Sequence, residues 1–103
     1  MNNSELLESE ILKKAVVRGK VILSSGKEAD FYVDSRRVTL DSVAAPLVRE
    51  VMLNLTKDLD YEAVGELTLG ADPVATAMLH ATARRGEKLD AFVVRKSEKV
   101  HGL

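Results

Sequence analysis

Ala91-Phe92-Val93-Val94, followed directly by Arg95-Lys96-Ser97-Glu98-Lys99-Val100-His101-Gly102, is the stretch on which the interpretation of this sequence depends. Residues 91–94 form a short apolar run within a strand predicted over residues 90–94, which is typical of a strand buried in a parallel sheet. The run ends in a segment with three cations and a histidine against one acid. Because ligands of open α/β sheets bind beyond the carboxyl ends of the strands, this segment indicates an anion-binding loop. A solvated charged loop is the alternative that the run alone leaves open.

The residues before this strand predict a strand, a loop and a helix. Residues 61–64 have the pattern of a strand, and residues 65–71 form the loop after it. Asp72 followed by Pro73 is typical of a helix cap and a first helical residue, and a helix is predicted over residues 74–85. Strand, helix and strand in this order predict a right-handed crossover within a parallel sheet.

The loop of residues 65–71 lacks both familiar nucleotide-binding motifs. Gly65 and Gly70 match the G-x-x-x-x-G half of a P-loop, but Ala71 and Asp72 stand where that motif requires Lys and Ser or Thr. No G-x-G-x-x-G is present. Backbone N–H groups at the start of the next helix could still receive a phosphate or diphosphate. Alternatively, the glycines only permit a tight strand-to-helix turn.

The first part of the chain predicts a packing helix and a hairpin. Residues 4–17 carry apolar side chains at four-residue spacing, which predicts a helix that Gly19 ends. Residues 21–23 and 31–33 predict the two strands of a hairpin with a polar tip over residues 24–30. A tip of this length is either functional or a plain solvated loop.

The next segment leads into the predicted parallel sheet. Residues 38–40 predict another short strand, and Asp41 or Ser42 is expected to cap a helix that runs to about Leu59. Pro46 falls near the first turn of this helix, where a missing N–H is tolerated best. Strands and helices that alternate in this way predict an α/β fold.

Composition favours one ordinary globular domain. The chain has 103 residues, 46% of them hydrophobic and 30% charged, with a formal net charge of −1. This balance does not favour a nucleic-acid or membrane partner, and the absence of cysteine excludes disulfides and thiol catalysis. The N-terminus lacks the features of a secretory signal, so a cytoplasmic protein is expected. His80 is expected to be a packed or half-exposed structural residue, and no residue is assigned as a metal ligand.

Three separated stretches resemble orotate phosphoribosyltransferases. Leu23-Ser24-Ser25-Gly26-Lys27-Glu28-Ala29-Asp30-Phe31-Tyr32-Val33-Asp34 is similar to the substrate hairpin of that family. Leu67-Thr68-Leu69-Gly70-Ala71-Asp72-Pro73-Val74-Ala75 is similar to its pyrophosphate loop and the following helix. The stretch of residues 95–102 resembles its mobile catalytic loop, R-K-x-x-K-x-H-G, which is the most specific of the three. The stretches occur in the family's order and span essentially the whole chain.

The resemblance implies a type I phosphoribosyltransferase fold. Residues 1–40 would form an N-terminal helix and a hood-like substrate hairpin, and residues 41–103 the first half of the parallel α/β core. It also implies transfer of ribose 5-phosphate from phosphoribosyl pyrophosphate to orotate, with Mg²⁺, to give orotidine 5′-phosphate and pyrophosphate. In this family the active sites are shared across a homodimer interface.

The resemblance also assigns the site residues. The substrate-binding set is Arg95, Lys96, Lys99, His101, Phe31, Tyr32, Leu69 and Gly70, of which Lys96 and Lys99 are the catalytic pair. By position in the motif, Arg95, Lys99 and His101 would contact the diphosphate of the donor. Lys96 would contact it from the neighbouring subunit. Phe31 and Tyr32 belong to the segment near the orotate ring.

The sequence departs from the family pattern at three places. Ser24 occupies a position where many members have lysine, and Glu66 adds a carboxylate that would repel an anion if it pointed inward. The ribose-5-phosphate signature, with its paired acids, would lie beyond Leu103. The chain is therefore expected to be an N-terminal portion, weakly active or inactive, that pairs into a dimer. A non-catalytic polyanion-binding protein and a phosphoribosyltransferase for another base remain the alternatives.

Overall fold

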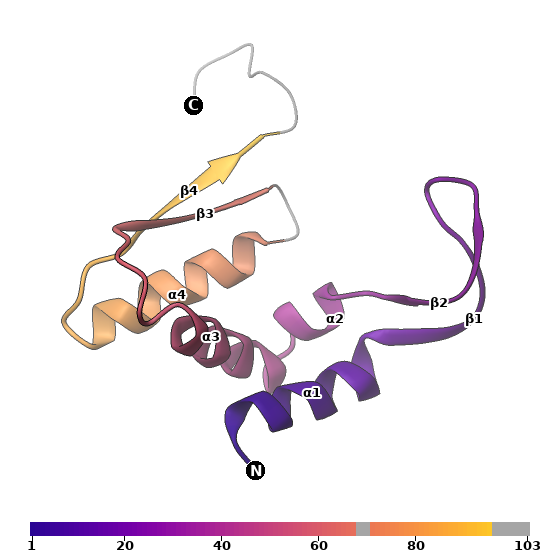
Figure 1. The fold of residues 1–103 in the computed structure, drawn as a ribbon, viewed down its shortest axis with the longest axis horizontal. Helices are drawn as coiled ribbons and strands as arrows, with labels where there is room; N and C mark the ends of the chain where they lie inside the picture. The colour runs from indigo at the N-terminus through magenta and orange to yellow at the C-terminus, as the bar shows by residue number, and fades with distance from the viewer. Residues whose placement is uncertain (68–70, 96–103) are drawn as a thin grey trace.

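The structure, a computed structural model, describes residues 1–67 and 71–95. In chain order, its elements are α1 (Asn3–Lys14), β1 (Val16–Ile22), β2 (Glu28–Val33), α2 (Arg36–Thr39), α3 (Ala44–Leu55), β3 (Ala63–Leu67), α4 (Asp72–Arg84) and β4 (Asp90–Val94). Figure 1 shows the β1–β2 hairpin on one side of the helices and the β3–β4 sheet on the other. The predicted α/β class is confirmed.

The strand–helix–strand unit predicted from the sequence is present. β3 and β4 pair in parallel, with Ala63 opposite Asp90 and Leu67 opposite Val94, and α4 connects them. β3 begins later than predicted and continues to Leu67, because its pairing with β4 extends through residues expected to be loop. Asp72 is the first residue of α4 rather than its cap, since Ala71 occupies the cap position and makes no side-chain capping bond.

A strand over residues 38–40 is not formed, and this prediction is wrong. The segment lies in the short helix α2, in which the N–H groups of Val38 and Thr39 donate to the carbonyl of Ser35. Val38 is buried against Ala15 and Ala44, so its apolar side chain serves a helical core. Within the described residues the parallel sheet therefore has two strands.

The chain leaves α1 earlier than the sequence predicts. The helix ends at Lys14, and Val16 already pairs with Val33 in the antiparallel β1–β2 hairpin. Gly19 does not end the helix, because it lies within β1 with a positive φ of 109° near an irregularity in the strand register. β-Branched residues favour the strand, and glycine suits the bulge. The predicted hairpin itself is confirmed, with longer strands.

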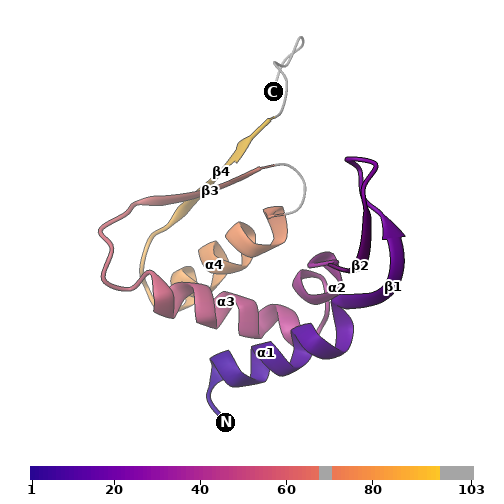
Figure 2. The ribbon, with the colours of Figure 1, turned by 45° about the vertical axis from the view of Figure 1, so that its right-hand side comes forward.

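Two small apolar cores lie on either side of α3. One joins α1, α2 and α3 around Ala15, Val38 and Ala44, and the other joins α3, α4 and the sheet around Leu53 and Met78. Figure 2 shows α3 between α1 and α4. The radius of gyration is 16.0 Å, against about 13 Å for a compact domain of this length. The arrangement is therefore open, and each core is limited.

One face of the β3–β4 sheet is covered by α4 (Figure 1). The other face carries exposed apolar side chains. Leu67, Phe92 and Val94 remain 66%, 53% and 44% exposed. Parallel sheets usually have both faces covered. No helix among the described residues is long and apolar enough to cross a membrane. The division into a hood of residues 1–40 and a core of residues 41–103 stays a prediction.

Asp41 caps α3, as predicted. Its Oδ2 accepts hydrogen bonds from the N–H groups of Val43 at 3.0 Å and Ala44 at 2.9 Å, and from Lys14 Nζ at 2.8 Å. The hydrogen bond from Lys14 is the main cause that lowers the pKa of Asp41, followed by that from Ala44. One carboxylate thus ties the end of α1 to the start of α3. The helix ends at Leu55, before the predicted Leu59.

Asp41→Asn is expected to lower stability near neutral pH and to have little effect in acid. A carboxyl with a lowered pKa in the folded state contributes stability above its unfolded pKa of 3.8, and this contribution is lost as pH falls through the folded pKa. Urea unfolding followed by circular dichroism, from about pH 7 to about pH 3, measures the difference. Asp58→Asn, an exposed site after α3, is the control. A deficit in Asp41→Asn that persists unchanged in acid would contradict the assignment.

Candidate functional site

The carboxyl ends of β3 and β4 form the edge at which the two predicted anion-binding loops begin. Leu67 and Val94 are paired, so the segments that follow them start from adjacent positions. Arg95 is the first residue after β4 and is exposed. α4 begins at Asp72, close to the same edge, as Figure 1 shows. Helix N-termini and the carboxyl ends of parallel strands are both typical anion sites.

Five residues assigned to the site lie outside the described residues. They are Lys96, Lys99, His101, Leu69 and Gly70. Their proposed contacts with the diphosphate, and the catalytic roles of the two lysines, therefore stay predictions. Of the predicted cationic loop, only Arg95 is described.

Gly65 belongs to β3 rather than to the loop that follows. It pairs with Phe92, and the Phe92 ring occupies the space where a Cβ on Gly65 would lie. The absence of a side chain at residue 65 is therefore explained by close packing between the strands. The alternative that Gly65 and Gly70 only permit a tight strand-to-helix turn therefore does not apply to Gly65.

Phe31 and Tyr32 lie on β2, away from the edge that holds Arg95. Phe31 is 55% exposed, whereas Tyr32 is half-buried and pairs with Val17. The hairpin contacts the rest of the described chain mainly through α1. In both Figure 1 and Figure 2 the hairpin tip and the carboxyl edge of the sheet point to the same side. Within the described part of the chain, these aromatic residues lie on the hairpin, and Arg95 lies on the separate β3–β4 sheet.

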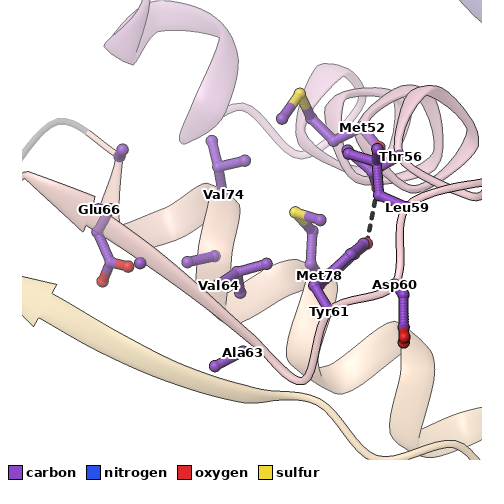
Figure 3. Close-up of a pocket in the computed structure, with 13 residues that line it drawn as sticks. Met52, Thr56, Leu59, Asp60, Tyr61, Ala63, Val64, Glu66, Val74 and Met78 are labelled. Atoms are coloured by element: carbon purple, nitrogen blue, oxygen red, sulfur yellow. Dashed lines mark hydrogen bonds between the residues drawn. The ribbon is translucent and has the colours of Figure 1, made fainter.

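A largely apolar cavity of about 540 Å³ lies between β3, α3 and α4. Met52, Val74 and Met78 contribute to its lining. At one end, the hydroxyl groups of Thr56 and Tyr61 are hydrogen-bonded at 2.6 Å, so these polar groups are satisfied. Figure 3 shows the Glu66 side chain at the other end, near the end of β3. The sequence does not predict this cavity, because its walls come from segments distant in the chain.

Glu66 is a buried acid at the carboxyl end of β3. It is 7% exposed, and its Oε2 has no hydrogen-bond partner within the described chain. Burial raises the pKa of Glu66, and the neighbouring Asp72 carboxyl raises it further. The Asp72 Oδ1 is likewise buried without a hydrogen-bond partner there. The carboxylate that the sequence places beside the pyrophosphate loop is therefore turned inward, next to a second acid.

Transition-metal ligation finds no support among the described residues. No group of three or more His, Asp or Glu side chains is gathered there as metal ligands. His80 is exposed on α4, so it is not a packed residue. The Glu66–Asp72 pair is the feature that sequence reasoning missed. The two acids are six residues apart, and only the return of the chain from β3 into α4 brings them together.

The α/β fold and its carboxyl edge are similar to those of phosphoribosyltransferases. No family model matches the chain. A phosphoribosyltransferase structure from Corynebacterium diphtheriae aligns with a TM-score of 0.81 at 48% identity, covering 100% of this chain and 56% of that one. The Mycobacterium tuberculosis orotate phosphoribosyltransferase in complex with phosphoribosyl diphosphate aligns with a TM-score of 0.77 at 48% identity, covering 98% of this chain and 60% of that one.

The curated relatives are orotate phosphoribosyltransferases. Orotate phosphoribosyltransferase from Streptomyces avermitilis is 69% identical over 97 residues, which are 94% of this chain and 53% of that protein. Over nearly all of its residues, the chain is similar to orotate phosphoribosyltransferases. It spans about half the length of the curated relatives that it matches.

Proposed function

We propose that this chain takes part in the orotate phosphoribosyltransferase reaction. In this reaction, N1 of orotate loses its proton and forms a bond to C1 of the ribose as the bond from C1 to the diphosphate breaks. The products are orotidine 5′-phosphate and pyrophosphate. The observation that carries the proposal is the pairing of Leu67 with Val94, because it starts both anion-binding segments at one edge. Similarity to orotate phosphoribosyltransferases supports the choice of orotate as the acceptor.

The diphosphate is proposed to bind beyond the carboxyl ends of β3 and β4. Arg95 leaves β4 at this edge and supplies a charge-assisted donor. Lys99 and His101 add donors from the same segment, and Lys96 adds one from a second copy of the chain. Leu69 and Gly70 contribute backbone groups. Lysines placed at the leaving diphosphate stabilise the charge that develops there, which lowers the barrier.

Orotate is proposed to bind near Phe31 and Tyr32. These residues lie apart from Arg95 within one chain, so a homodimer with shared sites is part of the proposal. The exposed apolar face of the β3–β4 sheet supports association of two copies, because such patches mark interfaces. Light scattering during size-exclusion chromatography at micromolar concentration is expected to show a dimer. A monodisperse monomer would contradict this part of the proposal.

Mg²⁺ is proposed as the cofactor. Mg²⁺ binds in proteins through one or two carboxylates together with phosphate oxygens and water. Glu66 and Asp72, each with a buried oxygen that lacks a hydrogen-bond partner in the described chain, fit the protein share of such a site. When bound, Mg²⁺ neutralises negative charge on the diphosphate.

A cytoplasmic location is also proposed, from the sequence alone.

Calorimetry with phosphoribosyl pyrophosphate, followed by an assay for orotidine 5′-phosphate, tests the function. We expect binding of the donor and slow turnover with orotate that becomes detectable at high protein concentration. Donor binding with no product, even at high protein concentration, would favour the polyanion-binding alternative. Product formed with a purine base instead of orotate would favour a different acceptor. Absence of donor binding would overturn the proposed function.

A further inference from the structure

The β1–β2 hairpin is joined to the rest of the chain at its base. Val16 pairs with Val33 at the open end of the hairpin, and the N–H of Asp34 donates to the carbonyl of Ala15 at 2.8 Å. Among the described residues, the hairpin packs against the other elements mainly through α1. Figure 2 shows it standing away from the helices. The angle at which the hairpin leaves the helices is therefore set near its base.

A small change of this angle would displace both the tip and the aromatic residues of the hairpin. A strand of this length spans about 20 Å, so a rotation of about 10° at the base would move the tip by about 3 Å. Phe31 and Tyr32 lie within two residues of Val33 and would move by about 1 Å. The position of these aromatic side chains thus depends on how firmly the base is held.

Apolar contacts hold the base of the hairpin against the helices. Ala15, which connects α1 to β1, is fully buried and packs with Val38 and Ala44. No residue of α1 itself, which is described throughout, is buried. The hydrophobic effect is non-directional, so a core of three small side chains keeps α1 close to α3 without fixing the rotation of one against the other. A directional bond is needed for that.

Lys14 supplies a directional bond at this place. It is the last residue of α1, two positions before β1 begins. Its Nζ lies 2.8 Å from Asp41 Oδ2 and 3.1 Å from Glu10 Oε2. Asp41 is in turn held by two backbone N–H groups at the start of α3. Because Lys14 and Asp41 are both half-buried, their charge-assisted hydrogen bond is screened less than an exposed one.

We propose that Lys14 is a positioning residue, whose bond to Asp41 fixes the angle between the hairpin and α3 and thereby places Phe31 and Tyr32 for the acceptor base. Lys14 itself does not contact the acceptor and acts only through the hairpin. The role of the two aromatic residues rests on the proposed function. The link between Lys14 and the hairpin angle does not depend on that function.

Pulsed electron–electron double resonance between two spin labels measures the hairpin angle. The chain has no cysteine, so Ser24→Cys at the hairpin tip and Asn54→Cys on α3 can carry the labels. Both positions are exposed. An excess of unlabelled chain ensures that the measured distances lie within one copy. We expect Lys14→Met to shift or broaden the distance distribution by about 3 Å or more, the displacement estimated for the tip.

Lys13→Met is the matched control for Lys14→Met. Lys13 is exposed in the same last turn of α1 and joins no ion pair among the described residues. Its replacement is expected to leave the distance distribution unchanged, and Lys14→Arg, which keeps the charge, is expected to keep it narrow. Circular dichroism checks the fold of each variant. If Lys14→Met does not fold, Asp41→Asn, whose amide oxygen can still cap α3, weakens the same bond from the other side. An unchanged distribution in the folded variant would overturn the inference.

Calorimetry with orotate and with phosphoribosyl pyrophosphate tests the effect on the acceptor. We expect Lys14→Met to weaken orotate binding by about tenfold and to leave donor binding nearly unchanged, since a misplacement of about 1 Å can cost up to about a hundredfold. Unchanged orotate binding despite a displaced hairpin would overturn the positioning role, as would equal losses for the two ligands. If the original chain binds neither ligand, the proposed function and the role toward the acceptor both fail, while the distance measurement still decides whether Lys14 fixes the hairpin.

Discussion

Leu53→Ala is expected to lower the free energy of unfolding by roughly 2–5 kcal/mol, the usual range for truncating a buried leucine. Leu53 is 7% exposed and packs in the core formed with Met78, Ala81 and Leu89. This core is one of two small ones, so the cavity left by the lost side chain has few neighbours that could fill it. A domain of ordinary stability, about 5–15 kcal/mol, would lose a large fraction of that stability.

Leu55→Ala is the matched control for Leu53→Ala. Both leucines belong to α3 and both changes remove the same atoms, but Leu55 is 71% exposed. Its replacement is expected to change stability by no more than about 0.5 kcal/mol. Urea unfolding followed by circular dichroism measures both variants against the original chain. Similar losses in the two variants would show that the core around Leu53 is not what holds α3 in place.

Arg95→Ala is expected to weaken binding of phosphoribosyl pyrophosphate by roughly tenfold or more. A hydrogen bond to a charged group is worth about 1.5–3 kcal/mol, which corresponds to that change in the dissociation constant. Arg95 follows directly from β4, at the edge where Leu67 and Val94 pair. Calorimetry at two salt concentrations measures the effect. The difference between the variants should shrink at high salt, because exposed charges are screened.

Lys88→Ala provides the control for Arg95→Ala. Lys88 is also an exposed cation, but it precedes β4 by two residues and so lies at the opposite end of that strand. Its removal lowers the net charge by the same amount and should leave donor affinity nearly unchanged. Equal losses in the two variants would mean that the donor responds to overall charge, and the carboxyl edge would no longer be supported as its site.

The sequence by itself determined the features that depend on neighbours in the chain. It placed β4 at Asp90–Val94, the hairpin in the first third of the chain and the α3 cap at Asp41 or Ser42. The strand and the hairpin are present, and Asp41 is the residue that caps the helix. Strand patterns, turns and caps are local signals, since the residues that produce them lie within a few positions of one another. Three motifs, which follow one another in the order found in orotate phosphoribosyltransferases, also indicated the similarity to that family.

Only the tertiary structure decided the features that depend on distant segments. Val38 lies in a helix rather than a strand because Ala15 and Ala44 bury it, and neither adjoins it in the sequence. Gly65 belongs to a strand because its partner Phe92, which lies across it, comes from β4. Glu66 and Asp72 form a buried acidic pair because the chain turns back from β3 into α4. Burial and strand pairing depend on contacts between distant segments, so no local pattern in the sequence predicts them.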